Sequence, residues 1–292
     1  MNRLILIDSH PLLYRSYYSP GTRSLKTSTG ILSGGFFGFI RSYLTLCSRF
    51  PKSHFIFCFD SGASWRNKIY RDYKSPHLPG TLEGFDEQLS NIKSFIWALD
   101  IPVFIQARLE ADDLISVCAC EWVTSVKDGT AVIVSSDRDF FQLVSERISC
   151  YDDRAKTFYG PAEVEAKTGV KPKHIVNYKA LVGDVSDNIT GVKGFGPKKA
   201  AQLVRYNSYD GILTVDELSI VHMNKQLIDL PKSLGELSIH LSRSASIRIS
   251  DRLEEVFNAF ENNILGKINV FEIERLLKLY EVKTININSF GD

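Results

Sequence analysis

The chain has 292 residues, with 35 Lys and Arg against 34 Asp and Glu, a net charge of +1 and a hydrophobic content of 44%. These are the values of an ordinary globular protein, and they exclude collagen-like, low-complexity and wholly disordered chains. The near-zero net charge argues at first against a nucleic-acid-binding protein, whose usual signature is a basic domain.

Short β-rich runs alternate with longer helical patterns in the first half of the chain. The predicted strands cover residues 4–8, 54–60, 102–105 and 131–137, and the predicted helices cover 35–48, 82–98, 112–123 and 140–144. Apolar strands that alternate with helices indicate an α/β fold with a mostly parallel central sheet flanked by helices.

From about residue 178 the β-rich runs stop, and the remainder is predicted to be mainly helical, with a Gly-rich turn at 191–197 and an amphipathic segment at 252–280. We therefore predict an α/β core over residues 1–177 and a helical region over 178–292. No clean linker separates the two, which allows them to share one core.

Two features bear on location. The apolar run at residues 4–7 ends at Asp8 and is too short for a signal peptide, and no stretch approaches the roughly 20 apolar residues of a membrane span. The five cysteines form no CxxC pair, which favours buried, reduced thiols. A cytoplasmic protein without membrane contact is predicted.

Acidic residues gather where the predicted strands end. Asp8, Asp60 and Asp137 close three of the four strands, and ligands of parallel α/β sheets bind at this edge. With the acidic residues of the following segments the set has nine members: Asp8, Asp60, Glu110, Asp112, Asp113, Asp137, Asp139, Asp184 and Asp187. Singly, several have a structural explanation, such as a helix cap at Asp112, Asp113 or Asp139, or a turn at Asp184.

Nine clustered carboxylates repel one another unless cations are bound between them. Oxygen ligands without nearby His or Cys indicate Mg²⁺ or Mn²⁺ and not Zn²⁺. So many ligands suggest two ions, the usual arrangement for in-line displacement at a phosphate. The chain contains no P-loop, no dinucleotide-binding glycine motif after a strand and no nucleophile elbow.

Basic and aromatic residues mix in the segment 65–74, which follows the second predicted strand. A solvated helix is the ordinary explanation. A nucleic-acid contact is the functional one, because cations bind phosphates and aromatic rings stack on bases. Lys74 would then stabilise charge on the scissile phosphate. The segment 191–200 combines glycines with Lys193, Lys198 and Lys199 and opens a helix, which suits a duplex backbone.

The ordered motifs resemble those of the 5′ nuclease family, which contains the 5′→3′ exonuclease domain of bacterial DNA polymerase I and the bacteriophage flap endonucleases. The matching segments are Ile7-Asp8 with Leu13-Tyr14-Arg15, Phe59-Asp60, Tyr73-Lys74, Glu110-Ala111-Asp112-Asp113, Ser136-Asp137-Arg138-Asp139, Gly183-Asp184-Val185-Ser186-Asp187-Asn188 and Gly191-Val192-Lys193-Gly194-Phe195-Gly196. They span about residues 4–235.

The resemblance implies a PIN-like nuclease core with two Mg²⁺, which Mn²⁺ can replace. Asp8, Asp60, Glu110 and Asp112 would surround the first ion. Asp137, Asp139 and Asp187 would hold the second, with Asp113 and Asp184 in support. It also implies a helical arch over about residues 61–84, and a helix-turn-helix element near 188–206 that binds duplex DNA, with K⁺ as a candidate ion.

The same resemblance assigns further roles. Lys74 matches the catalytic lysine of the arch and Arg15 a phosphate-contacting arginine. Relatives often carry an arginine three residues after the arch lysine. Here that position is His77, so the second catalytic cation would be replaced in part by His77, or supplied by Arg71 or by another residue. The residues predicted to contact DNA are Tyr14, Arg66, Tyr70, Tyr73, Lys193, Gly194, Gly196, Lys198 and Lys199.

The resulting hypothesis is a monomeric structure-specific 5′ nuclease, acting as a 5′→3′ exonuclease and 5′-flap endonuclease in replication or repair, in a bacterial cell or a phage-infected host. Its expected partner is DNA with 5′ single-strand/duplex junctions, with RNA–DNA hybrids as a further candidate. The alternatives are an acidic-site ribonuclease that removes RNA primers and a non-catalytic DNA-junction binder. Subtracting the nine site carboxylates leaves 25 anions against 35 cations, so the neutral total conceals a basic remainder.

Overall fold

The computed structural model describes residues 2–27, 30–75, 82–99, 101–205, 209 and 211–233. His77 and the predicted amphipathic segment 252–280 lie outside these residues, as does the rest of the predicted helical region beyond 233.

A six-stranded sheet forms the centre of the molecule, with strand order β3-β2-β1-β4-β5-β6. The first five strands are parallel and β6 is antiparallel to β5. The strands are β1 (Arg3–Asp8), β2 (His54–Cys58), β3 (Val103–Phe104), β4 (Thr130–Val134), β5 (Ile148–Asp152) and β6 (Thr157–Tyr159).

Apolar residues on both faces of the strands explain why the sheet is covered on both sides. In β1, Leu4 and Leu6 pack into one buried cluster, while Ile5 and Ile7 pack into another. Because successive side chains of a strand point to opposite faces, a fully apolar strand needs a helical layer on each face. The two layers bury the sheet and leave its carboxyl edge for a site.

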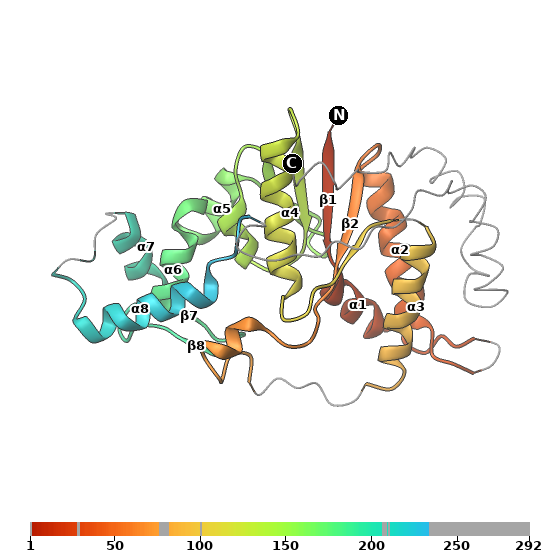
Figure 1. Cartoon of the computed structure of the whole chain (residues 1–292), viewed down its shortest axis with the longest axis horizontal. Helices are drawn as coiled ribbons and strands as arrows, with labels where there is room; N and C mark the ends of the chain where they lie inside the picture. Colours follow the sequence, from red (N-terminus) through yellow and green to blue (C-terminus); the bar gives the residue numbers. More distant parts are fainter. Residues whose placement is uncertain are drawn as a thin grey trace.

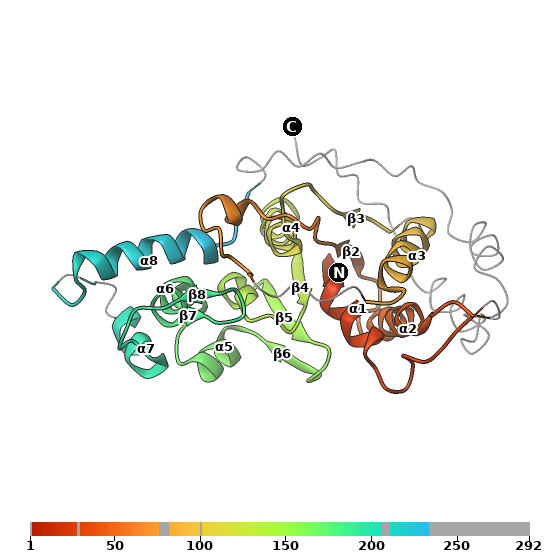
Figure 2. The same ribbon diagram turned by 90° about the horizontal axis from the view of Figure 1, so that it is seen from below.

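The helices supply those layers (Figures 1 and 2). One cluster contains residues of α4 (Ala111–Ser125). The other contains residues of α1 (Ser9–Tyr17), α2 (Gly34–Arg49) and α3 (Phe85–Ala98). The N-terminus of α2 has no local side-chain cap. Instead Gln88 Oε1 of α3 accepts hydrogen bonds from the N–H groups of Gly35 and Phe36, at 2.7 and 3.1 Å.

The segment after β6 is mainly helical. Its elements are α5 (Pro161–Thr168), α6 (Ile175–Val182), β7 (Gly183–Asp184), β8 (Ile189–Thr190), α7 (Pro197–Arg205) and α8 (Val215–Ile228). Their buried apolar residues join the cluster that contains Leu4, Leu6 and α4. The α/β part and the helical part therefore share one core. None of the described helices is long and apolar enough to cross a membrane.

Most predicted elements are confirmed, with corrections at their ends. β2 and β4 stop before Asp60 and Asp137, so these residues follow the strands instead of closing them. The predicted helix 140–144 is a 3-10 helix, η2 (Asp139–Leu143). The prediction that strands stop at residue 178 is wrong, because β7 and β8 pair as a hairpin. Elements of two or three residues are too short to show a hydrophobic period.

Further differences concern whole elements, since β5, β6 and α5 were not predicted. The helix α1 was not predicted, because it follows β1 without a break in the sequence, and Pro11 lies in its first turn, where proline is tolerated. The predicted helical arch over 61–84 contains, in its described parts, one 3-10 helix, η1 (Trp65–Lys68), and turns.

Burial of the cysteines gives a first test of the fold. All five thiols are free, with Cys47, Cys58 and Cys150 buried and the other two half-buried. Burial raises the pKa of Cys47 to about 12, so its reactive thiolate is scarce at neutral pH. We expect a thiol reagent to modify at most Cys118 and Cys120 in the native protein, and all five cysteines in guanidinium.

The control is a Cys47→Ser variant. It should titrate with one thiol fewer after unfolding and with an unchanged number before it. Rapid modification of all five cysteines in the native protein would contradict the described core.

Candidate active site

The site lies at the carboxyl edge of the sheet, at the point where the chain reverses its winding direction. β1 is in the middle, with β2 and β3 added on one side and β4 and β5 on the other. Open α/β sheets bind ligands at such a switch point, because the connecting loops diverge there. Asp8 ends β1, and Ser135 Oγ after β4 donates a 2.8 Å hydrogen bond to its carboxylate. The N–H of Asp137 in turn donates to Ser135 Oγ at 3.0 Å.

The N-terminus of α4 orients a second group of carboxylates. Glu110 is the N-cap residue, and its N–H donates to Asp113 Oδ2 at 3.1 Å. The next N–H, of Ala111, donates to Asp60 Oδ1 at 2.7 Å. Free N–H groups and the positive end of the helix dipole favour anions at this position. The helix therefore holds Asp60 and presents Glu110 and Asp112 to the same edge.

A buried arginine stabilises this group. Arg66 is 1% exposed. Its Nη1 lies 2.6 Å from Glu110 Oε2, and its Nη2 lies 2.7 Å from Asp113 Oδ1. Its Nε donates to the carbonyl oxygen of Leu227, at the end of α8, at 2.7 Å. A planar guanidinium satisfies several acceptors at fixed angles, so Arg66 connects η1, α4 and α8 at one point.

Lys74 reaches the carboxylates from a strained turn. Its φ of 54° lies in the left-handed region, which costs about 1–2 kcal/mol for a residue other than glycine. Its N–H donates to the carbonyl oxygen of Asp187 at 3.0 Å, and Asn188 Nδ2 donates to the carbonyl oxygen of Asp72 at 2.8 Å. These bonds fix the turn against the β7–β8 hairpin. The ammonium group then lies 2.5 Å from Glu110 Oε1 and 4.0 Å from Asp187 Oδ1.

A third group surrounds another lysine. Oxygens of Asp139, Asp184 and Asp187 all lie within 4.8 Å of one another. The Lys179 ammonium contacts Asp139 and lies 2.6 Å from Asp184 Oδ2. Each of the two lysines thus places a cation between carboxylates from different segments of the chain.

The base of the β7–β8 hairpin depends on two facing glycines. Gly183 has a φ of +83°, and a Cβ atom there would lie 2.4 Å from the nitrogen of Gly191. A Cβ on Gly191 would lie 2.2 Å from the carbonyl oxygen of Val182. Close backbone packing therefore requires both glycines, and it brings Asp184 and Asp187 to the site.

The enclosure of the carboxylates changes their acidity. Burial raises the pKa of Asp8, and the charges of Asp60 and Asp137 raise it further. Burial also raises the pKa of Asp112, with the charge of Asp8 acting in the same direction. At Asp184 burial acts upward as well, but Lys179 lowers the pKa below its ordinary value. The inner carboxylates thus lack enough positive charge from the protein itself.

Two residues predicted to contact DNA need correction. Arg66 was predicted to contact DNA, but its guanidinium is buried against Glu110 and Asp113. Tyr73 was predicted to contact DNA, but it is 5% exposed and its hydroxyl donates to Glu110 or Asp187, with oxygens at 3.2 and 3.1 Å. Asp113 was predicted to support the metal-site carboxylates. It is fully buried, with both oxygens bonded to Arg66, and it contacts the N–H of Glu110 without facing the open edge.

The other predicted residues lie nearer to solvent. Tyr14 stacks on Phe85, with ring centroids 4.7 Å apart, and Lys199 lies over the ring of Phe195, 3.9 Å from its centroid. Tyr70 is half-buried. The exposed predicted residues are Arg71, Lys193, Gly194, Gly196, Lys198 and Lys199. The predicted helix-turn-helix element stays a prediction, with α7 as the helix described within its range.

Several functional contacts were not predicted. Lys179 lies one helical turn before the Gly183-Asp184 motif, and this spacing was the available signal. Asp153 was not singled out, although its oxygens lie 2.6 Å from Arg15 Nη2 and 2.6 Å from Lys156 Nζ. No local motif marks such a partner, because Arg15 and Asp153 are far apart in the sequence. Arg15 and Asp8 also line one cavity of about 240 Å³.

Family models match nearly all of the described chain. Residues 3–169 match the 5′–3′ exonuclease N-terminal resolvase-like domain, and residues 170–254 match the 5′–3′ exonuclease C-terminal SAM fold. The chain is 30% identical to a 5′–3′ exonuclease of Aquifex aeolicus, over 95% of each chain. It is 29% identical to a 5′–3′ exonuclease of Bacillus subtilis, over 97% of this chain and 99% of that one.

Solved structures share the fold. The T5 D15 protein co-crystallised with metal ions has a TM-score of 0.63 at 17% identity, covering 95% of this chain and 99% of that one. Flap endonuclease-1 of Methanococcus jannaschii has a TM-score of 0.59 at 17% identity, covering 96% and 92%. The fold and the clustered carboxylates thus define a nuclease. The chain belongs to the 5′–3′ exonuclease family.

The buried guanidinium of Arg66 gives a stability prediction. Arg66→Ala should lower the free energy of unfolding by about 3–5 kcal/mol, because it leaves Glu110 and Asp113 buried without their cation. Arg66→Lys should lie between this variant and the wild type, since an ammonium keeps the charge but not the planar set of donors. Urea unfolding measures both.

The matched control is Arg71→Ala, in the same segment. Arg71 is exposed, so its removal should change stability by no more than about 0.5 kcal/mol. Equal stabilities of the Arg66→Ala and Arg71→Ala variants would contradict the role assigned to Arg66.

Lys179 gives a prediction about metal binding. Its ammonium occupies the space between Asp139 and Asp184, so it competes with any divalent ion there. Lys179→Ala should lower the Tm of the metal-free protein. It should also reduce the Mg²⁺ concentration that half-saturates the Tm increase by about tenfold. Lys173→Ala, an exposed lysine outside the cluster, should change neither quantity. A weaker response to Mg²⁺ in Lys179→Ala than in the wild type would overturn the interpretation.

Proposed function

We propose that the protein is a structure-specific 5′ nuclease that hydrolyses DNA phosphodiesters near 5′ single-strand/duplex junctions, leaving a 5′-phosphate and a 3′-hydroxyl. The observation that carries this proposal is the convergence of carboxylates from β1, α4, the segment after β4 and the β7–β8 hairpin on one sheet edge, with Lys74 among them. Membership of the 5′–3′ exonuclease family supports the direction of cleavage.

The donor set fits hard divalent cations. All the converging ligand atoms are carboxylate oxygens, and burial together with neighbouring carboxylates raises the pKa values of Asp8 and Asp112, which supports a site that takes up positive charge. We infer two ions, Mg²⁺ or Mn²⁺. Asp8, Asp60, Glu110 and Asp112 would hold the first, and Asp137, Asp139 and Asp187 the second, with Asp113 and Asp184 in support. When bound, such ions offset phosphate charge and activate water for in-line displacement.

The protein's own cations would position the scissile phosphate. Lys74 is 42% exposed along its side chain, so its ammonium can leave Glu110 and stabilise charge that develops on the phosphate. Arg15 shares a cavity with Asp8 and would hold a neighbouring phosphate. Its ion pair with Asp153 keeps the guanidinium oriented before substrate binds. The exposed Arg71 is our candidate for the second basic group of the segment.

The duplex would lie against the Gly-rich turn that precedes α7. Lys193, Gly194, Gly196 and Lys198 are exposed there, and no described atom lies within 4 Å of a Cβ built on either glycine. An open turn of this kind lets a phosphate backbone approach the N–H groups at the start of a helix. K⁺ is the candidate ion for this turn. Structures related to the chain by fold include a D15 flap endonuclease with DNA and metal ions and Rad2 with DNA substrate.

Cleavage of a labelled 5′-flap duplex tests the proposal. Asp137→Ala and Asp60→Ala should each abolish cleavage in Mg²⁺, with a loss of at least about a thousandfold, while binding of the duplex stays measurable. Lys74→Ala should lower the rate by about a hundredfold. The control is Asp229→Ala, which removes an exposed carboxylate away from the site and should leave the rate unchanged.

Parallel assays separate the alternatives. A wild-type protein that binds the duplex but does not cut it in Mg²⁺ or Mn²⁺ is a junction binder. Faster cleavage of an RNA hairpin or an RNA–DNA hybrid than of the DNA flap indicates a ribonuclease. Full activity of the Asp137→Ala variant would overturn the assignment of the site.

A further inference from the structure

We propose that a cavity beside the carboxylates binds the sugar-phosphate backbone next to the scissile phosphate, through Arg138 and Lys167. We call it the α5–α6 cavity. It measures about 560 Å³, and its lining includes Ser136, Arg138, Lys167, Tyr178, Lys179 and Asp184. The inference rests on the proposed function, because it concerns the substrate of the same site.

The cavity is lined by carboxylates and by residues of a neighbouring helix. Asp137 and Asp184 line it together with Lys167 and Thr168 at the end of α5. Figure 2 shows α5 and α6 on the same side of the sheet, with β7 and β8 beside α6. A volume of several hundred Å³ is that of an ordinary ligand site in a protein. The cavity therefore has room for a strand that continues from the carboxylate edge.

The two cations of the cavity are available to a ligand. Arg138 and Lys167 are both exposed, and neither side chain forms an ion pair or a hydrogen bond with another residue in the described part of the chain. Lys179, by contrast, already pairs with Asp139 and Asp184. Arg138 also lies between Asp137 and Asp139 in the chain, so its backbone is fixed by the segment that bears the carboxylates.

Electrostatics explains why cations are needed at this place. A polyanionic strand that approaches nine carboxylates is repelled unless positive charge lies along its path. Arg138 and Lys167 supply that charge just outside the carboxylate group. Tyr178 and Ile175 line the same cavity with apolar surface, which suits the sugar part of the backbone. Carboxylates and unpaired cations thus line the same cavity, which suits ions held by the carboxylates and phosphates held by the cations.

The position of the cavity fits a continuous path for the strand. It shares Pro11 and Ser136 with the 240 Å³ cavity that contains Asp8 and Arg15. Gly169, the residue after Thr168, accepts a 2.7 Å hydrogen bond through its carbonyl oxygen from Arg205 of α7. The α5–α6 cavity therefore adjoins the Asp8–Arg15 cavity, and the chain beside it contacts the helix that follows the proposed duplex-binding turn.

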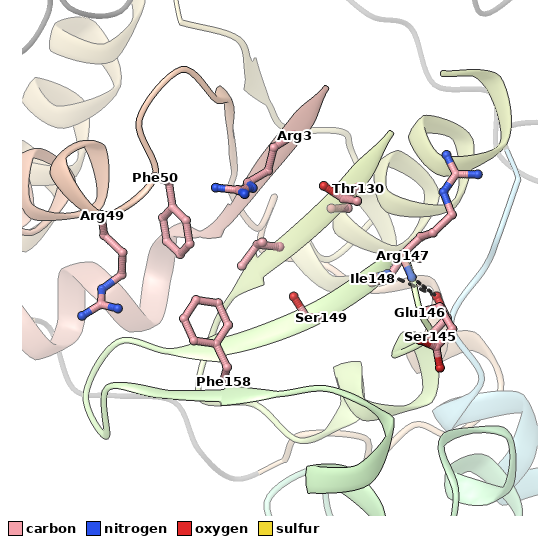
Figure 3. Close-up of a pocket in the computed structure, with 12 residues that line it drawn as sticks. Arg3, Arg49, Phe50, Thr130, Ser145, Glu146, Arg147, Ile148, Ser149 and Phe158 are labelled. Atoms are coloured by element: carbon pink, nitrogen blue, oxygen red, sulfur yellow. Dashed lines mark hydrogen bonds between the residues drawn. The ribbon is translucent and has the colours of Figure 1, made fainter. Parts of the chain in front are cut away.

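A second cavity serves as a comparison for the α5–α6 cavity. It lies at the amino ends of β1, β4 and β5, opposite the carboxylates, and measures about 360 Å³. In Figure 3 the guanidinium groups of Arg49 and Arg147 lie at opposite outer ends of its lining residues. The Arg147 guanidinium donates hydrogen bonds to the carbonyl oxygens of Gly129 and Val126, at 2.8 and 2.9 Å. Arg49 thus offers a matched control: an exposed arginine that lines a hollow far from the carboxylate edge.

Single-turnover cleavage of a 5′-flap duplex at increasing enzyme concentration separates binding from chemistry. In the double variant Arg138→Gln/Lys167→Gln, we expect the half-saturating enzyme concentration to rise about tenfold while the maximal rate changes less than about twofold. The slope of the logarithm of the half-saturating enzyme concentration against the logarithm of the salt concentration should decrease by about 1.5, the value for two lost phosphate contacts. Arg49→Gln and Lys173→Gln should match the wild type, and all variants should keep its Tm.

The outcomes distinguish this inference from the function on which it rests. Fluorescence anisotropy of the labelled duplex is measured for each protein beside cleavage. A wild type that binds without cutting overturns the proposed function, and the anisotropy of the double variant still tests the cavity. A wild type that neither binds nor cuts overturns both. If the double variant has the same half-saturating enzyme concentration and the same salt slope as Arg49→Gln, the cavity assignment alone is overturned. A double variant that loses only maximal rate has the same consequence.

Discussion

Mutual repulsion among carboxylates is the constraint on which the arrangement of this protein depends. Residues from five separate segments place acidic groups at one sheet edge, where burial raises the pKa of Asp8 and Asp112. Three cations hold them there: Arg66 against Glu110 and Asp113, Lys74 against Glu110, and Lys179 against Asp139 and Asp184. Such a site lowers the stability of the fold, because unpaired buried charge is unfavourable. A functional requirement for bound cations explains why the site is present despite this cost.

The same contacts join the two parts of the chain. Arg66 donates to the carbonyl oxygen of Leu227 at the end of α8, and Gln142 after β4 bonds the backbone of Ile228 and Leu230. The β7–β8 hairpin carries Asp184 and Asp187 and is held against the turn that contains Lys74. The helical part therefore completes the site as well as extending the fold. One guanidinium therefore contacts both α8 and Glu110.

The arginine and lysine residues of the chain divide by environment into structural and substrate-facing groups. Arg66 is buried and paired, whereas Arg138 and Lys167 are exposed without an ion pair to any described residue. Lys74 and Lys179 share properties of both groups, since each forms an ion pair and each is partly accessible to solvent. Composition counts all of these cations equally. Their burial and partners decide which of them stabilise the protein and which remain for phosphates.

The sequence by itself determined the α/β class, the parallel strands β1, β2 and β4, and the set of acidic residues, because apolar runs and strand-end carboxylates are local patterns. It also led to the nuclease family through motifs in a fixed order. Only the tertiary structure decided that Arg66 and Tyr73 face inward, that Asp113 supports Glu110, and that Lys179 and Asp153 belong to the site. These outcomes depend on contacts between residues far apart in the chain, such as Arg66 with Leu227 and Arg15 with Asp153. A local pattern carries no information on the direction of a side chain relative to such a partner, so burial and pairing emerge only when the segments pack.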